Sequence, residues 1–473
     1  MVFNSLEYAL FFPTVLALYW LVRSRKPQNA LLLIASYLFY GAWDARFLVL
    51  MLFSTVTDFS VGRWLERTED DRRRKRIFLI SLVVNLGILG FFKYFDFFID
   101  STAGLLETFG LQPNLPTLRI LLPVGISFYT FHGISYTFDV YRRHIRATNN
   151  ILDFACFIAF FPQLVAGPIG RAHIQLPQFE KERTRPTAEG VRSALFLILL
   201  GLFKKVAIAD ALAPYVDQAF RGSGRAGALQ LLVGMYAFAL QIYGDFSGYT
   251  DMARGSARLL GIELIRNFEQ PYLSRNITEF WRRWHISLST WLRDYLYVSL
   301  GGNRGGGRLL TYRNILITML LGGLWHGAAW TFVIWGGLHG LFLVGHRLLG
   351  RQRPITTEPG RVGWRDALPI LATFHLVSVA WVFFRAASLE QALSYLGGIF
   401  TLRGGPLNPD AAALLVAAAV AVLGIDLMQR NTRTEEAVLD WGPVARGVAY
   451  AVMIVAIVVF SGGTPVPFIY FQF

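Results

Sequence analysis

Cysteine is almost absent from this chain, and charged residues are scarce. Cys156 is the only cysteine among 473 residues, which excludes an internal disulfide framework and any metal site built from cysteines. Charged residues make up 16% of the chain and hydrophobic residues 54%, whereas soluble domains carry about 25% charged residues. This composition excludes an ordinary soluble domain and indicates a protein that buries most of its surface in lipid.

Several chemical signatures are also missing. No internal repeat is convincing, which weakens a transporter interpretation. The glycine-rich run 301–307 lacks the Gly-Lys-Ser/Thr ending of a P-loop. Neither a serine–histidine–aspartate order nor a metal-ligand spacing stands out, so no bound metal is expected.

Apolar blocks fill most of the chain, and each is close to the length of about 20 residues that crosses a bilayer. They predict an all-α polytopic membrane protein with one integral domain over residues 1–473. The block 150–170 is broken by two prolines and two glycines, which predicts a re-entrant or broken helix. The expected spans are 6–22, 28–43, 46–62, 77–98, 119–138, 190–212, 228–250, 309–324, 327–346, 367–384, 410–428 and 445–460.

The net charge of +14 is concentrated between the apolar blocks. The positive-inside rule accounts for most of this basicity, so nucleic acid is not an expected partner. Placing the basic clusters in the cytoplasm puts both ends of the chain outside. No basic region precedes the first apolar run, so we expect an uncleaved first span rather than a signal peptide. The clusters lie at 23–26, 72–76, 142–146, 181–185, 347–353 and 430–433.

Residues 251–308 differ from the rest because arginines and aromatic residues alternate there. On a helical wheel the large apolar side chains share one face, which predicts an amphipathic helix at the cytoplasmic interface or lining a cytoplasmic funnel. His285 falls at the edge of that face and is expected to point inward. The apolar face holds Trp281, Trp284, Leu288, Trp291, Leu292 and Tyr295, and the arginines are Arg254, Arg258, Arg266, Arg275, Arg282, Arg283, Arg293, Arg304 and Arg308.

The arginines of this region have two interpretations that stay open. They can hold an anionic acyl donor, such as the phosphates of coenzyme A, or they can contact lipid headgroups. The flexible loop 301–307 can add backbone N–H groups to a phosphate site, although a plain loop explains it equally well. Asp245 lies just before the region and Asp251 is its first residue, and both are interpreted as counter-ions for its arginines.

His326 lies in an apolar, glycine-rich run inside a long hydrophobic block. An ionisable side chain at membrane depth costs roughly 2 kcal/mol or more if charged, so it indicates function by default. Burial favours the neutral imidazole, which can accept a proton. A hydrogen-bonded structural histidine remains the alternative for His326. The histidines at 132, 339 and 375 are interpreted as structural.

The C-terminal motif 464–473 is aromatic to its last residue, whereas chain ends are usually polar and frayed. Pro465 and Pro467 stiffen its approach. One interpretation is an interfacial aromatic anchor. The other is that Tyr470 enters an outward-facing cavity, where a phenol can act as a covalent nucleophile once a base removes its proton.

Taken together, these motifs resemble the membrane-bound O-acyltransferase (MBOAT) family. The resemblance rests on residues 280–289 and 291–295, on Gly301-Gly302-Asn303-Arg304 and on Trp325-His326-Gly327. The bacterial branch that serves O-acetylation of alginate and related exopolysaccharides is the most similar. Residues 1–3, 36–40, 166–169 and 468–473 carry that finer likeness.

The resemblance implies a helical bundle with re-entrant segments and a central tunnel. It implies that His326 is the principal catalytic residue, that His285 supports it in the tunnel and that Tyr470 carries the acyl group. Arg282, Arg293, Asn303 and Arg304 are expected to bind the donor, acetyl-CoA.

The same resemblance implies O-acetylation of an extracytoplasmic polysaccharide from the bacterial inner membrane, with a periplasmic acetyltransferase as partner and membrane lipid around the chain. Two alternatives stay open. The donor is an acylated carrier protein, as in teichoic acid D-alanylation, or the chain is a non-enzymatic transporter.

Overall fold

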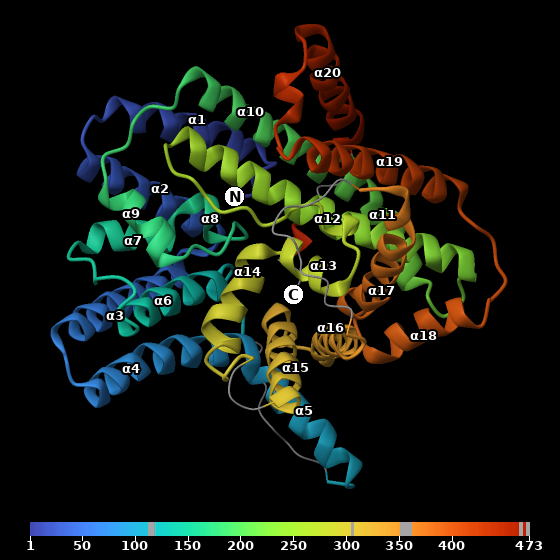
Figure 1. The fold of residues 1–473 in the computed structure, drawn as a ribbon, viewed down its shortest axis with the longest axis horizontal. Helices are drawn as coiled ribbons and strands as arrows, with labels where there is room; N and C mark the ends of the chain where they lie inside the picture. The colour runs from blue at the N-terminus through green and yellow to red at the C-terminus, as the bar shows by residue number, and fades with distance from the viewer. Residues whose placement is uncertain (112–117, 119, 304–306, 351–361, 463–466, 470–473) are drawn as a thin grey trace. The chain divides into compact units, whose positions relative to one another are not determined.

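The structure is a computed structural model that describes residues 1–473 except 112–117, 119, 304–306, 351–361, 463–466 and 470–473 (Figure 1). The described residues form helices and connecting segments and contain no strand. Five of the described helical segments are long and apolar enough to cross a membrane: Arg25–Arg67, Asp71–Thr108, Trp364–Arg385, Pro409–Thr432 and Pro443–Phe460. The predicted all-α membrane class is confirmed.

The chain divides into two compact units. The first unit comprises Met1–Val191 and Ser256–Ile265, and the second comprises Arg192–Gly255 and Arg266–Phe473. Helices α10 (Ala188–Phe203) and α12 (Ala228–Leu259) have residues in both units. The prediction of a single integral domain stays a prediction.

In the first unit, apolar helices pack around a small polar core. Helices α3, α4 and α6 lie side by side (Figure 1). Asp58 on α3 is fully buried between them, and its carboxylate accepts hydrogen bonds from Ser81 Oγ at 2.6 Å and from Asn85 Nδ2 at 2.9 Å. These partners satisfy a buried polar group that would otherwise be costly. The helices of this unit are α1 (Leu6–Leu21), α2 (Arg25–Asp44), η1 (Ala45–Phe47), α3 (Leu48–Arg67), α4 (Asp71–Leu89), η2 (Gly90–Tyr94), α5 (Phe95–Thr108), α6 (Ile126–Tyr141), α7 (Ile151–Ala159), α8 (Phe161–Leu164) and α9 (Ala172–Glu180).

The apolar block 150–170 is broken, as predicted. Helix α7 ends at Ala159, α8 is a single turn, and residues 165–171 are not helical. The N–H of Gly170 donates to His132 Nε2 at 2.9 Å, so a buried side chain supplies the partner that the helix does not. This contact fits the structural role predicted for His132. Whether the segment is re-entrant stays a prediction.

The second unit contains the two histidine motifs. Besides parts of α10 and α12, its elements are η3 (Lys204–Asp210), α11 (Ala211–Arg221), η4 (Pro271–Leu273), α13 (Ile277–Arg283), α14 (Ile286–Trp291), η5 (Leu292–Tyr297), α15 (Gly307–His326), α16 (Trp330–Leu348), η6 (Trp364–Asp366), α17 (Ala367–Arg385), α18 (Leu389–Phe400), α19 (Pro409–Thr432), η7 (Ala437–Asp440) and α20 (Pro443–Phe460). Element η3 is a π-helical turn that joins α10 to α11 without a break, and such turns often mark functional positions.

Helices α15 and α16 form a tight antiparallel hairpin that ends beside His326. A methyl group on Gly323 or on Gly336 would come within 3.1 Å of the other glycine's backbone. Small residues allow membrane helices to approach this closely. The glycine-rich run therefore brings the two helices together, and His326 is the last residue of α15.

The prediction of one amphipathic helix over residues 281–295 is wrong. Helix α13 ends at Arg283, and α14 begins at Ile286. The break occurs because residues 283–286 hydrogen-bond to the backbone at 267–269: the N–H of Ile286 donates to the carbonyl of Asn267 at 2.9 Å. The predicted inward orientation of His285 nevertheless holds, since its side chain is fully buried. Most of the predicted apolar face is buried as well, with Trp281 half-buried, while Arg282 and Arg293 are exposed.

Candidate active site

The structure brings the two predicted catalytic histidines together. The ring centroids of His285 and His326 are 6.2 Å apart. That separation is too long for a direct hydrogen bond between the two imidazoles, but short enough for both to contact one small group. Both side chains are buried, at 0% and 4% exposure. We call them the histidine pair.

His285 adopts a strained backbone conformation. It caps α14 with φ 43° and ψ 55°, in the left-handed region. For a residue with a side chain, this region costs about 1–3 kcal/mol and occurs mainly where the surrounding structure enforces it. Asn267 enforces it here, because its carbonyl accepts from Ile286 N and its side-chain oxygen accepts from Ser287 N at 3.3 Å. These hydrogen bonds therefore fix the backbone from which the imidazole projects.

Aromatic rings surround the histidine pair. The ring of His326 lies 5.0 Å from Trp325, 5.0 Å from Trp335 and 5.3 Å from Phe384. The ring centroids of His285 and Phe246 are 4.6 Å apart, with the two rings nearly perpendicular. Burial lowers the pKa of His285 to about 3, so this imidazole is neutral near neutral pH and can accept a hydrogen bond.

A third histidine, His339, packs against one tryptophan of this group and accepts a hydrogen bond from another tryptophan. The ring of His339 is 4.8 Å from Trp335, and its Nδ1 accepts a hydrogen bond from Trp281 Nε1 at 3.2 Å. Since Nδ1 accepts, the proton of the neutral ring is on Nε2. This arrangement fits the structural role predicted for His339.

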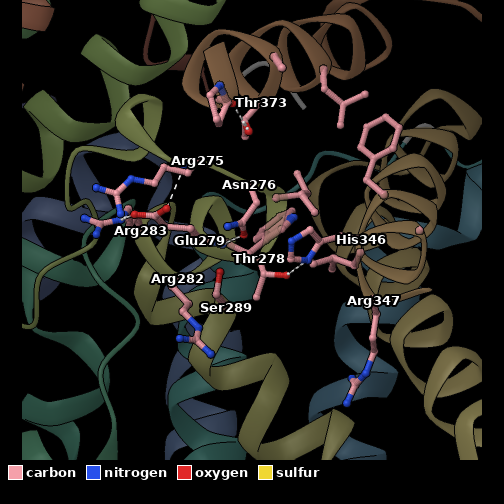
Figure 2. A pocket seen from close by; sticks show the side chains of 18 of the residues that line it. Arg275, Asn276, Thr278, Glu279, Arg282, Arg283, Ser289, His346, Arg347 and Thr373 are labelled. Atoms are coloured by element: carbon pink, nitrogen blue, oxygen red, sulfur yellow. Dashed lines mark hydrogen bonds and ion pairs between the residues drawn. The ribbon is translucent and has the colours of Figure 1, made fainter. Parts of the chain in front are cut away.

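A cavity of about 2400 Å³ lies in the second unit (Figure 2). It is large enough for a nucleotide-sized ligand, and arginine is the most frequent charged residue in its wall. We call it the arginine cavity. Its arginines are Arg275, Arg282, Arg283, Arg293, Arg347, Arg365 and Arg430.

Three of the four predicted donor-binding residues line the arginine cavity: Arg282, Arg293 and Asn303. Arg293 forms an ion pair with Asp294 at 2.6 Å, and its side chain is 62% exposed. Asn303 Oδ1 accepts from Tyr297 OH at 2.5 Å. The fourth residue, Arg304, lies outside the described residues.

The seven arginines of the cavity fall into two groups. Four are paired with a carboxylate: Arg283 and Arg430 both contact Glu279 Oε1, at 3.1 Å and 3.2 Å, Arg275 pairs with Asp366 and Arg293 with Asp294. Arg282, Arg347 and Arg365 make no ion pair within the part of the chain that the structure describes. In Figure 2 the side chains of Arg282 and Arg347 both extend toward the bottom of the view. This second group is available to an anionic ligand.

The histidine pair does not line the arginine cavity. Two tryptophans connect the regions: Trp281 belongs to the cavity wall and lies 5.8 Å from Trp335, which contacts His326. The predicted tunnel stays a prediction.

Sequence reasoning missed several residues of the cavity wall, above all Arg347 and Arg430. Both belong to basic clusters that the positive-inside rule explained, so nothing in the sequence distinguished them from topological charges.

The predicted counter-ion role of Asp245 is wrong, and that of Asp251 holds only in part. Asp245 pairs with Lys205 at 2.8 Å. Asp251 pairs with Lys204 at 2.8 Å and is also 3.8 Å from Arg254. Both aspartates face the π turn η3, because the close packing of α12 against this turn places the two lysines opposite them. Tyr470 lies outside the described residues, so its acyl-carrier role stays a prediction.

These features define a class of protein: an all-α, multi-pass membrane protein with two buried histidines in one unit with a basic cavity. The chain belongs to the membrane-bound O-acyltransferase family, whose sequence profile matches residues 73–365. It is therefore an O-acyltransferase, as predicted, and this membership removes the transporter alternative.

Relatives within the family differ in what they acylate. A probable alginate O-acetylase of Pseudomonas putida is 42% identical over 504 positions, covering 100% of both chains. A peptidoglycan O-acetyltransferase of Helicobacter pylori is 37% identical over 402 residues, which is 79% of this chain and 74% of its own. A teichoic acid D-alanyltransferase of Bacillus subtilis is 28% identical over 280 residues, 58% of this chain and 71% of its own.

Proposed function

We propose that this O-acyltransferase takes acetyl from cytoplasmic acetyl-CoA and passes it across the bacterial inner membrane for O-acetylation of an extracytoplasmic polysaccharide. The observation that carries the proposal is the presence of the histidine pair and the arginine cavity in one compact unit. The names of the two O-acetylating relatives support acetyl as the group and a polymer as the final acceptor.

The arginine cavity suits a small-molecule donor with several phosphates. Arginine recognises phosphate through paired, charge-assisted hydrogen bonds. Arg282, Arg293 and Arg347 would contact the phosphates, and Asn303 would hold a neutral part of the donor. A carrier protein presents a single phosphate on a flexible arm, so it would use fewer of these arginines.

His326 would act as the general base for the acceptor hydroxyl. The hydroxyl oxygen attacks the thioester carbonyl, the carbon–sulfur bond breaks, and the proton taken by His326 leaves with the thiol. General bases of this kind contribute about 10²–10⁴-fold to the rate. His285 would orient or polarise the carbonyl, which its fixed backbone and neutral ring suit.

The first acceptor would be the hydroxyl of Tyr470, and a periplasmic acetyltransferase would then move the acetyl group to the polymer. Relay through the chain's own tyrosine fits a sequence in which no stretch is long and polar enough to form a separate polymer-binding domain. Membrane lipid would surround the exposed apolar side chains of the helices.

A comparison of the two donors tests the proposal. Purified protein in lipid nanodiscs receives either acetyl-CoA or an acetylated carrier protein, and the free thiol that is released is measured over time. We expect thiol release from acetyl-CoA, lowered by about 10²–10⁴-fold in His326→Ala. The matched control is His375→Ala, because His375 is exposed on α17 and pairs with Tyr236 OH at 2.7 Å. Equal rates in wild type and His326→Ala, or use of the carrier protein alone, would overturn the proposal.

A further inference from the structure

Two aspartates on α12 make similar ion pairs with lysines of η3 but differ in their other contacts. Asp245 pairs with Lys205 and Asp251 with Lys204, each at 2.8 Å, and all four side chains are buried. Asp251 is also 3.8 Å from Arg254, whereas Asp245 contacts the described part of the C-terminal segment: its Oδ2 accepts a hydrogen bond from the backbone N–H of Ile469 at 2.7 Å. The two residues are 224 positions apart in the sequence.

The geometry of Lys205 explains why Asp245 can make this contact. Lys205 Nζ lies 2.7 Å from Asp210 Oδ1 and 2.8 Å from Asp245 Oδ1. Because the lysine occupies Oδ1 of Asp245, the other oxygen faces the tail and takes the Ile469 N–H. A backbone hydrogen bond to an ionised carboxylate is stronger than one between neutral groups.

The contact holds the tail beside the histidine pair. Phe468 and Ile469 are 2% and 3% exposed, although ends of chains are usually frayed. The ring of Phe468 lies 4.7 Å from Tyr249 and 6.0 Å from Phe246, and Phe246 contacts His285 at 4.6 Å. The ring of Phe246 therefore packs against both the tail and the imidazole of His285.

We infer that Asp245, held by Lys205, is a positioning residue that fixes the C-terminal segment at Ile469 beside the histidine pair. The next residue in the sequence is Tyr470, the proposed acyl carrier. We call the Asp245–Ile469 hydrogen bond, with the Lys205 ion pair that holds the carboxylate, the clamp. The relevance of the clamp to acyl relay rests on the proposed function. The existence of the clamp is independent of that function, because it is a contact within the protein.

Hydrogen exchange at the Ile469 amide tests the clamp directly. Mass spectrometry with fragmentation of the C-terminal peptide reports this amide, and the preceding Pro467–Phe468 bond simplifies the assignment because proline carries no N–H. Asp245→Ala removes the acceptor, while Lys205 keeps Asp210 as its partner. We expect exchange at Ile469 to become roughly tenfold faster or more.

Asp251→Ala is the control, since it removes the same kind of lysine ion pair between the same two elements, together with the longer pair to Arg254, and leaves the Asp245–Ile469 hydrogen bond in place. It should leave exchange at Ile469 within about threefold of wild type. Asp245→Asn keeps an acceptor oxygen and should restore part of the protection. Unchanged exchange in Asp245→Ala, or equal acceleration in Asp245→Ala and Asp251→Ala, would overturn the inference.

A second experiment measures the effect of the clamp on acyl transfer. Asp245→Ala should lower acetyl label on the C-terminal peptide by about tenfold with little change in the KM for acetyl-CoA, because the donor site is elsewhere. A wild-type protein that never acquires label contradicts the proposed function, whereas the exchange result still decides the clamp. A rise in KM with full labelling would overturn the positioning role.

Discussion

The histidine pair and the arginine cavity belong to the same compact unit, yet their surroundings are opposite. His285 and His326 are buried among aromatic rings, whereas Arg282 and Arg293 are exposed on the cavity wall. Burial keeps an imidazole neutral and strengthens each electrostatic interaction that it makes. Exposure lets guanidinium groups keep their charge at little cost. The chain thus separates binding of a charged donor from proton transfer.

The comparison predicts that the two regions control different kinetic constants, and the largest effect is at His326. His326→Ala should lower kcat by about 10²–10⁴-fold, because a general base acts only in the transition state. The KM for acetyl-CoA should change by less than about threefold. Steady-state thiol release measures both constants in nanodiscs supplied with the periplasmic acetyltransferase and an acceptor polysaccharide, so that Tyr470 is regenerated after each transfer. A raised KM with an unchanged kcat would place His326 in donor binding instead.

The next effect concerns the arginines without a carboxylate partner. Arg282→Ala and Arg347→Ala should each raise the KM for acetyl-CoA roughly tenfold with little change in kcat. The reason is that a hydrogen bond to a charged group contributes about 1.5–3 kcal/mol, and the exposure of these side chains reduces that contribution. Arg221→Ala is the control, because Arg221 is an 83% exposed arginine outside the cavity wall. Equal KM values for all three variants would show that the arginine cavity does not bind the donor.

The neutral state of His285 predicts an acid-sensitive fold. Its folded pKa of about 3 lies below the value of about 6.5 expected in the unfolded chain. Stability from the neutral ring is therefore complete above pH 6.5 and is lost as the pH falls toward 3, by up to about 1.4 kcal/mol per pH unit. Unfolding of His285→Gln should depend less steeply on pH across this window than unfolding of wild type. Identical slopes would show that His285 is not buried as described.

The smallest effect is expected where the two regions meet. Trp281→Phe keeps the ring at the cavity wall but removes the hydrogen bond to His339 Nδ1. A neutral hydrogen bond contributes about 0.5–1.5 kcal/mol, so kcat/KM should fall by about threefold. His339→Phe should have no further effect once Trp281 is changed. Additive losses in the double variant would contradict a shared role for the two side chains.

Local features of the chain were predictable from the sequence, since span length and charge placement follow from the bilayer alone. The expected span 6–22 matches α1 (Leu6–Leu21), and the expected span 410–428 lies within α19 (Pro409–Thr432). His285 and His326 were also identified from their apolar and aromatic neighbours, and the structure places them together.

The features that were missed all depend on contacts between distant residues. The bend at His285 arises from pairing with Asn267, which a helical wheel cannot represent. Arg347 looked like a topological charge until folding placed it in the cavity wall. The clamp between Asp245 and Ile469 joins a helix to the last described residues of the chain, and no periodicity predicts such a pair.

One measurement tests the central claim most directly: peptide mass spectrometry of the protein after incubation with acetyl-CoA in nanodiscs, in wild type and His326→Ala. The account predicts one acetyl group on Tyr470 of the wild-type protein and none on the variant. Equal labelling of both proteins would show that His326 is not the base. Thiol release by wild type without any label on the C-terminal peptide would contradict the relay through Tyr470.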